Sequence, residues 1–216
     1  MPRKRVRFGL RPAERQHWHL QGSGKSLETN RAQQRDARSG KERLSASGPA
    51  VPCSARIQAT DLEQGTWIVV LRADEIPHVV MLQGGVCFSL EHDGNRRYPA
   101  RKLWRLVNAS RIPTLFCELG PWANGAVSDT YARFERIDDD GDCFLPVRDY
   151  CARWSPDLAA CSFPYELVPA LATGGRLART AAVHFLEGPT PSAITLLTYS
   201  RAEIRARIAA VRAGER

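Results

Sequence analysis

Two residues that together could perform thiol chemistry each stand at the head of a predicted element. His78 opens an apolar run over residues 78–83, and Cys143 opens a stretch with helical spacing that extends to residue 154. A cysteine at a helix N-terminus lies where unpaired backbone N–H groups and the helix dipole favour the thiolate, and a nearby histidine can accept the thiol proton. If the fold brings them together, the pattern predicts a nucleophile and its general base.

A Gly-Gly pair between two strand-like runs predicts a β-hairpin. The runs cover residues 78–83 and 86–91, and glycine at positions 84 and 85 tolerates the positive φ angles of a two-residue turn. Such a turn places Gln83 opposite Val86. Because each step outward keeps the same register, the turn fixes which residues face one another along both strands.

This register places Glu91 directly opposite His78. Cross-strand partners share a face and bring their Cβ atoms to about 4.5–5.5 Å, so a carboxylate there can hold an imidazole ring. The sequence therefore predicts a catalytic set of Cys143, His78 and Glu91. His92 points to the other face and ranks lower, although a loop slip of one residue would exchange the two roles.

The remaining elements alternate between strands and helices. We expect a buried strand at 67–71, a helix starting with Pro99 as its first residue, a strand at 113–119 and a helix at 128–137. Further on we expect a helix capped by Asp142 with Cys143 in its first turn, a short helix at 164–172, a strand at 194–199 and a final helix after a Ser200–Glu203 capping box. This order predicts an α+β fold with a small, mainly antiparallel sheet and flanking helices.

The positive charge of the chain is concentrated at its start. The formal net charge is +8 over 216 residues. Residues 1–50 hold 12 Lys+Arg against 4 Asp+Glu, whereas residues 51–216 hold 19 of each. We therefore divide the chain into a disordered basic tail, 1–50, and a single α+β domain, 51–216. The tail is either an arm for RNA or an anionic membrane surface, or merely a solvated leader.

The cysteine pattern argues against a bound metal and against a dithiol. Six cysteines occur without any CxxC spacing or paired histidines, so we expect no zinc site, no redox pair and no cofactor. The tail lacks the apolar segment of a secretory signal, and no run reaches the roughly 18 apolar residues of a membrane span. We therefore expect a cytoplasmic protein without a membrane span.

Two segments resemble ion-binding motifs but lack residues that those motifs require. The segment 21–26 contains Gly-Ser-Gly-Lys-Ser, but a phosphate loop needs a glycine where His19 stands and a hydrophobic strand before it. The acidic run 138–142 has Cys143 where a calcium-binding EF-hand needs glycine and Asp149 where it needs glutamate. The acidic run is better interpreted as a solvated loop.

The run His78-Val-Val-Met-Leu-Gln-Gly, the returning strand and the later Cys143 helix resemble the circularly permuted papain-like proteins. That superfamily includes NlpC-type cell-wall peptidases and relatives of lecithin-retinol acyltransferase, and the similarity covers roughly residues 66–154. The resemblance implies a papain-like permuted fold and a thiol site for acyl transfer or amide hydrolysis.

Two hypotheses about function follow. The first is a papain-like cysteine hydrolase or acyltransferase that acts on an amide or ester bond through Cys143, His78 and Glu91, with an unknown acyl or peptide substrate. The second is a noncatalytic binding or accessory domain whose basic arm contacts nucleic acid or an acidic partner. In either case Trp104, Trp122 and Trp154 are partner contacts or parts of the core.

Overall fold

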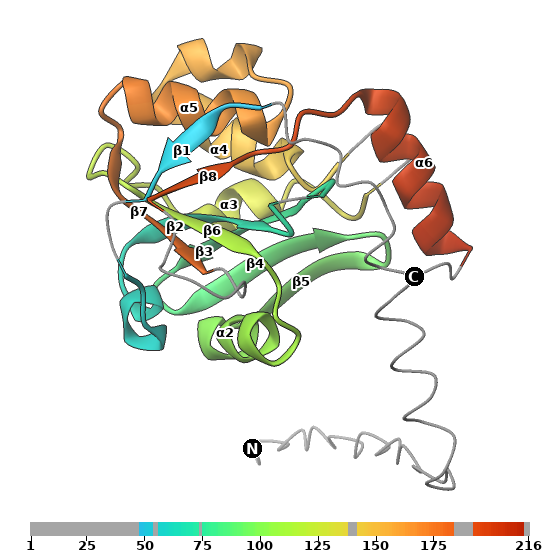
Figure 1. Cartoon of the computed structure of the whole chain (residues 1–216), viewed down its shortest axis with the longest axis horizontal. Coiled ribbons are helices and arrows are strands. Elements are labelled where there is room, and N and C mark those ends of the chain that lie inside the picture. Colours follow the sequence, from blue (N-terminus) through green and yellow to red (C-terminus); the bar gives the residue numbers. More distant parts are fainter. Residues whose placement is uncertain (1–47, 54–55, 74, 138–141, 184–191, 214–216) are drawn as a thin grey trace, which may run out of the picture. The chain divides into compact units, whose positions relative to one another are not determined.

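The computed structural model describes residues 48–53, 56–73, 75–137, 142–183 and 192–213 (Figure 1). The predicted tail lies outside the described residues, apart from its last three positions. The predicted mixture of helices with a mainly antiparallel sheet is confirmed.

A six-stranded antiparallel sheet forms the centre of the domain, in the order β5-β4-β3-β2-β6-β7. Its strands are β2 Thr66–Leu71, β3 His78–Gln83, β4 Val86–Glu91, β5 Gly94–Pro99, β6 Thr114–Leu119 and β7 Leu177–Val183. A separate two-stranded antiparallel ladder pairs β1 Ala50–Pro52 with β8 Ala193–Thr195. The buried central strand β2 has no solvent-facing side, which explains its continuous apolar sequence.

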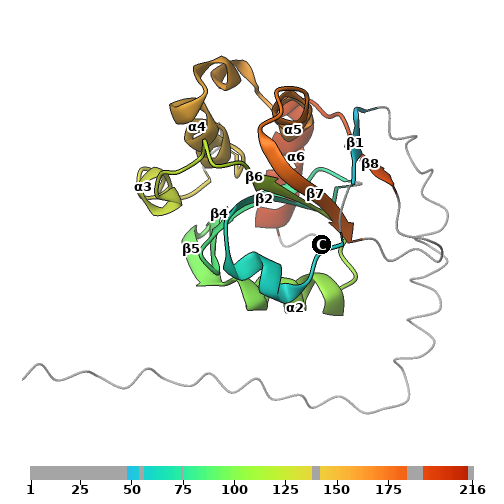
Figure 2. The same cartoon turned by 90° about the vertical axis from the view of Figure 1, so that its left-hand side faces the viewer.

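Helices cover both faces of the sheet, as Figure 2 shows. One face packs against α2 Ala100–Ala109 and the 3-10 helix η1 Ala59–Glu63. The other face packs against α3 Val127–Tyr131, α4 Leu145–Trp154 and α5 Pro164–Thr173. The chain also forms η2 Pro156–Ala160 and α6 Arg201–Arg212. Because side chains alternate along a strand, the four buried residues of β3 alternate between these two cores.

The predicted hairpin is confirmed, with the predicted strand limits and turn. Gln83 pairs with Val86, and the ladder continues to Met81 and Phe88. The glycines at 84 and 85 have φ angles of 54° and 77°. Two consecutive left-handed residues form the turn whose twist suits antiparallel strands.

Three strands, β1, β5 and β7, were not predicted, and β5 changes the interpretation of Pro99. Residues 94–99 form the edge strand β5, so Pro99 ends a strand and is the N-cap of α2 instead of its first helical residue. Of the other two, β1 pairs with β8 and β7 pairs with β6. Strands β5 and β7 form the two edges of the six-stranded sheet, and the partners of β1 and β7 lie far away in the chain.

The helix predicted for 128–137 is wrong in its extent, because α3 ends at Tyr131. Competing hydrogen bonds hold the following segment against the sheet. Asn95 Nδ2 donates to the backbone oxygen of Tyr131 at 2.6 Å, and the Ile137 N–H donates to the backbone oxygen of Glu91 at 3.0 Å. The predicted strand at 194–199 is likewise shorter, since β8 covers only Ala193–Thr195.

Candidate thiol site at the opened end of the hairpin

His78 begins a hydrogen-bonded relay that ends at a carboxylate. Its Nε2 atom lies 2.8 Å from Ser89 Oγ, and that hydroxyl donates to Glu91 Oε1 at 3.1 Å. All three residues lie on β3 and β4, whose alternation places them on the same face of the hairpin. The predicted partnership of His78 with Glu91 therefore runs through a fully buried serine.

The direction of the Ser89–Glu91 hydrogen bond assigns the proton of the neutral His78 ring to one nitrogen. Ser89 has a single hydroxyl proton, and Glu91 accepts it. Ser89 Oγ is then the acceptor for His78, so the neutral ring must carry its proton on Nε2. Nδ1 is left with a lone pair, the form of histidine that acts as a general base.

Cys143 lies where the two hairpin strands separate. In the register of the turn, Val79 and Leu90 would form the next hydrogen-bonded pair beyond Met81 and Phe88. Instead the Val79 N–H donates to Cys143 Sγ at 3.3 Å. Because ladder hydrogen bonds run in the plane of a sheet, the thiol occupies the position that the backbone of β4 would otherwise take.

The helix after Cys143 begins later than predicted. Residue Leu145 is the first of α4, and Phe144 is its N-cap, so Cys143 stands in the turn before the helix. Asp142 still caps this turn: its Oδ1 accepts from the Phe144 N–H at 2.8 Å, and its backbone oxygen accepts from the Leu145 N–H at 3.2 Å. The thiol therefore receives less support from the dipole of α4 than a residue in the first turn would.

Burial keeps the thiol protonated. Cys143 is 9% exposed, and desolvation raises its pKa to about 12. The Val79 N–H lowers the pKa, while the neighbouring Asp142 carboxylate raises it by like-charge repulsion with the thiolate. Both burial and the adjacent carboxylate therefore oppose ionisation of Cys143, and burial is the larger cause.

The same effect keeps His78 neutral. Burial lowers its pKa to about 4, and the positive charge of Arg72 lowers it further. A neutral imidazole and a neutral thiol thus form the resting pair at neutral pH.

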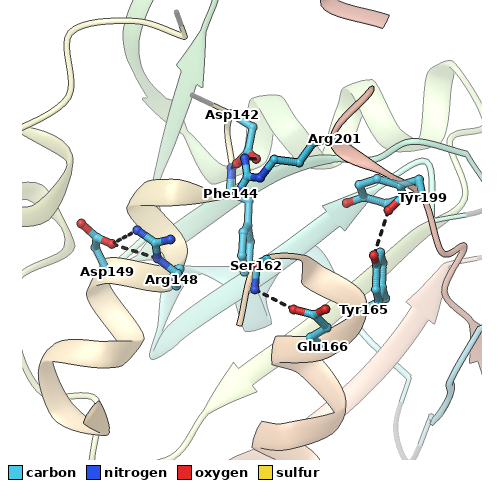
Figure 3. Close-up of polar contacts among 9 residues, drawn as sticks. All are labelled: Asp142, Phe144, Arg148, Asp149, Ser162, Tyr165, Glu166, Tyr199 and Arg201. Carbon is cyan, nitrogen blue, oxygen red and sulfur yellow. Dashed lines mark hydrogen bonds and ion pairs between the residues drawn. The ribbon is translucent and has the colours of Figure 1, made fainter. Parts of the chain in front are cut away.

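Asp142 also links the turn to the C-terminal helix. Its Oδ2 lies 3.5 Å from Arg201 Nη1 at the start of α6, and Figure 3 shows Arg201 beside both Asp142 and Phe144. Nearby, the Tyr165 hydroxyl donates to the Tyr199 backbone oxygen at 2.8 Å. Burial raises the pKa of Tyr199, and the proximity of Cys143 raises it further. The segment before α6 therefore lies close to the thiol.

The structure places Cys143 and His78 near the same end of β3 but on different faces of the sheet. Cys143 packs in the core that contains Val79, whereas His78 alternates onto the opposite face, with Val80. Cys143 bonds to the main chain of Val79, directly after His78, yet no hydrogen bond links the thiol to the imidazole among the described residues. His92 is exposed beyond the end of β4. Ser89 was missed by the sequence reasoning, although its place two residues before Glu91 on the same face could have indicated it.

Comparisons with family models, curated proteins and solved structures found no match to this chain. Within the described ranges, no cluster of three or more His, Cys, Asp or Glu side chains could hold a metal ion. None of the helices described there is long and apolar enough to cross a membrane.

Proposed function

We propose that this protein is a thiol-dependent hydrolase or acyltransferase acting on an amide or ester bond. The observation that carries the proposal is the hydrogen-bonded relay from His78 through Ser89 to Glu91. The relay fixes a neutral tautomer with Nδ1 available as a base, and it begins one residue from the amide that contacts the Cys143 thiol. The papain-like resemblance is part of the same proposal.

In the first step, Cys143 Sγ attacks the acyl carbonyl while its proton passes to His78 Nδ1. The imidazolium then returns this proton to the departing amine or alkoxide, and a thioester remains on Cys143. Water or an acceptor alcohol or amine, deprotonated by the same ring, attacks the thioester and releases the thiol. Glu91 stabilises the transient imidazolium through Ser89, and the Val79 N–H is a hydrogen-bond donor beside the sulfur.

The resting pair sets a requirement on this mechanism. Because burial keeps both groups neutral, the thiol must lose its proton as it attacks and not beforehand. Direct transfer over so large a difference in pKa is costly, and alternation along β3 places the two side chains on opposite faces. The proposal therefore requires substrate binding to rearrange this end of the hairpin so that the thiol and Nδ1 meet.

A second candidate is a noncatalytic binding or accessory domain with the same fold. It is favoured by one observation, the burial that opposes ionisation of both Cys143 and His78. In this alternative the thiol simply accepts the N–H of Val79 where the hairpin opens.

The decisive experiment measures acyl transfer by the full chain and by matched cysteine variants. The probes are p-nitrophenyl acetate and an N-acetyl dipeptide anilide, with peptide mass spectrometry to locate any acylated cysteine. We expect acylation at Cys143 and a loss of at least about 100-fold in turnover for both Cys143→Ala and His78→Ala. Cys151→Ala, which removes another buried thiol from the same region, should retain turnover.

Ser89 and Glu91 act through the ring, so their variants test positioning. Ser89→Ala should lower kcat more than it raises KM, and it should change the acid limb of the pH profile. Glu91→Gln keeps a hydrogen-bond acceptor and should therefore retain more activity than Glu91→Ala. If neither probe is turned over and Cys143 is never acylated, or if Cys143→Ala keeps full turnover, the enzyme proposal is wrong and the noncatalytic candidate replaces it.

A further inference from the structure

Positive charge is unevenly placed within the folded domain itself. Residues 94–112 contain six Lys+Arg and no acidic residue, although residues 51–216 together contain 19 of each sign. Outside this stretch those residues therefore hold 13 basic against 19 acidic side chains, since 19 − 6 = 13. A domain that is neutral overall thus carries a strongly cationic segment made of β5, α2 and the turn after it.

Helix α2 separates its charges from its buried side. Leu103 and Val107 are fully buried, whereas Arg101, Lys102 and Arg105 are all exposed. At about 100° per residue, these three cations lie within one arc of roughly 100°, opposite the two buried residues. The outer side of α2 is therefore a cationic stripe.

The edge strand extends this stripe. Lys102 Nζ lies over the Tyr98 ring at 5.5 Å, which joins α2 to β5. Arg96 shares the Tyr98 face of β5 and pairs with Asp93. In contrast, no salt bridge among the described residues involves any of the three cations of α2. We call Arg96, Arg101, Lys102 and Arg105 the α2 surface.

Protection of the sheet edge does not explain the α2 surface. Charged side chains on an exposed edge strand discourage pairing with another chain, and this accounts for Arg96. The cations of α2 lie on a helix that has no free sheet edge, so edge protection leaves them unexplained.

We propose that the α2 surface binds the phosphate backbone of nucleic acid, independently of the thiol site. Arginine forms bidentate contacts with phosphate, and three of the four cations are arginine. A membrane is disfavoured because Leu106, 48% exposed, is the one large apolar side chain that α2 presents to solvent. An acidic protein partner is also disfavoured, because surfaces that bind proteins have an apolar centre and the α2 surface is charged there.

The test compares full chains that differ in three charges. The variant Arg101→Gln/Lys102→Gln/Arg105→Gln removes the helical cations. The control Arg133→Gln/Arg136→Gln/Arg153→Gln removes three exposed cations from residues after α3 and within α4. Both keep the basic segment 1–50, so its contribution cancels. Binding of a fluorescent single-stranded RNA of about 16 nucleotides is measured by anisotropy over a range of salt concentrations.

We expect the α2 variant to bind at least about tenfold more weakly and its salt slope to fall by about 2, because three phosphate contacts are lost. The control should bind like the unaltered chain. Equal weakening in both variants, or in neither, overturns the proposal. It is also overturned if polyglutamate or phosphatidylglycerol vesicles displace the RNA as effectively as unlabelled RNA of equal charge, since the surface would then not select nucleic acid.

Discussion

At the scale of single residues, Asp142 has two opposing effects on its surroundings. Its carboxylate accepts the Phe144 N–H and thereby stabilises the turn that holds Cys143. The same negative charge raises the pKa of the Cys143 thiol, and burial raises the pKa of Asp142 itself. The hydrogen bond and the charge can be separated, because asparagine keeps an acceptor without the charge.

We therefore predict different outcomes for two substitutions. Asp142→Asn should leave the free energy of unfolding nearly unchanged and increase the rate of iodoacetamide alkylation at Cys143, because loss of the carboxylate lowers the thiol pKa. Asp142→Ala also loses the cap and should destabilise the protein by about 1 kcal/mol. Urea unfolding and peptide-resolved alkylation at pH 8 provide the measurements. Slower alkylation of Asp142→Asn would contradict this account.

At the scale of elements, the hairpin β3–β4 combines a strictly defined turn with an opened far end. The turn sets the register, and the register puts Ser89 and Glu91 on the face of His78. Beyond Met81 the ladder gives way to the contact between Val79 and Cys143. The turn at one end of the hairpin therefore sets the relative positions of the candidate site residues at the other end.

The turn glycines should respond differently to substitution. Gly84→Asn should change the free energy of unfolding by less than about 0.5 kcal/mol, because asparagine tolerates the left-handed conformation and the position has open space around it. Gly85→Val should destabilise by about 1–2 kcal/mol, since φ is +77° there and a β-branched residue is strained. Urea denaturation measures both changes. Equal stability of the two variants would show that the backbone conformation of the turn does not limit stability.

At the scale of the whole molecule, burial of His78 couples folding to pH. The folded pKa of about 4 lies below the ordinary value of 6.5, so the unfolded chain binds a proton more readily than the folded one. Above about pH 6.5 His78 is neutral in both the folded and the unfolded chain, and the free energy of unfolding is at its full value. As the pH falls toward 4, the unfolded chain takes up a proton that the folded chain does not, and the free energy of unfolding decreases. Because the His78 side chain is partly exposed to solvent, we expect the decrease in the free energy of unfolding to be about 1–3 kcal/mol.

The pH dependence can be assigned to His78 with a matched pair of variants. His78→Gln cannot take up a proton, so its free energy of unfolding should fall less between pH 7 and pH 4.5 than that of the unaltered protein. His92→Gln changes an exposed histidine and should keep the original pH dependence. Urea unfolding at the two pH values measures the difference. An unchanged dependence in His78→Gln would assign the effect to other groups.

Features that depend on neighbouring residues could be predicted from the sequence. The Gly-Gly turn and alternating strands predicted the hairpin and its register, and Ser200 with Glu203 predicted the capping box that α6 has, with Ser200 N donating to Glu203 Oε2 at 2.7 Å. The short helix predicted at 164–172 is likewise present, as α5. These features could be predicted because the residues that stabilise them lie within a few positions of one another.

The assembly of the candidate site depends on contacts between segments that are distant in the sequence. Ser89 joins His78 to Glu91, Cys143 replaces β4 as the partner of Val79, and α3 ends where Asn95 binds its backbone. Burial then decided the protonation of Cys143 and His78. The sequence pattern placed a thiol and an imidazole at the heads of two elements, but contacts between distant segments and the loss of water around them determine their chemistry.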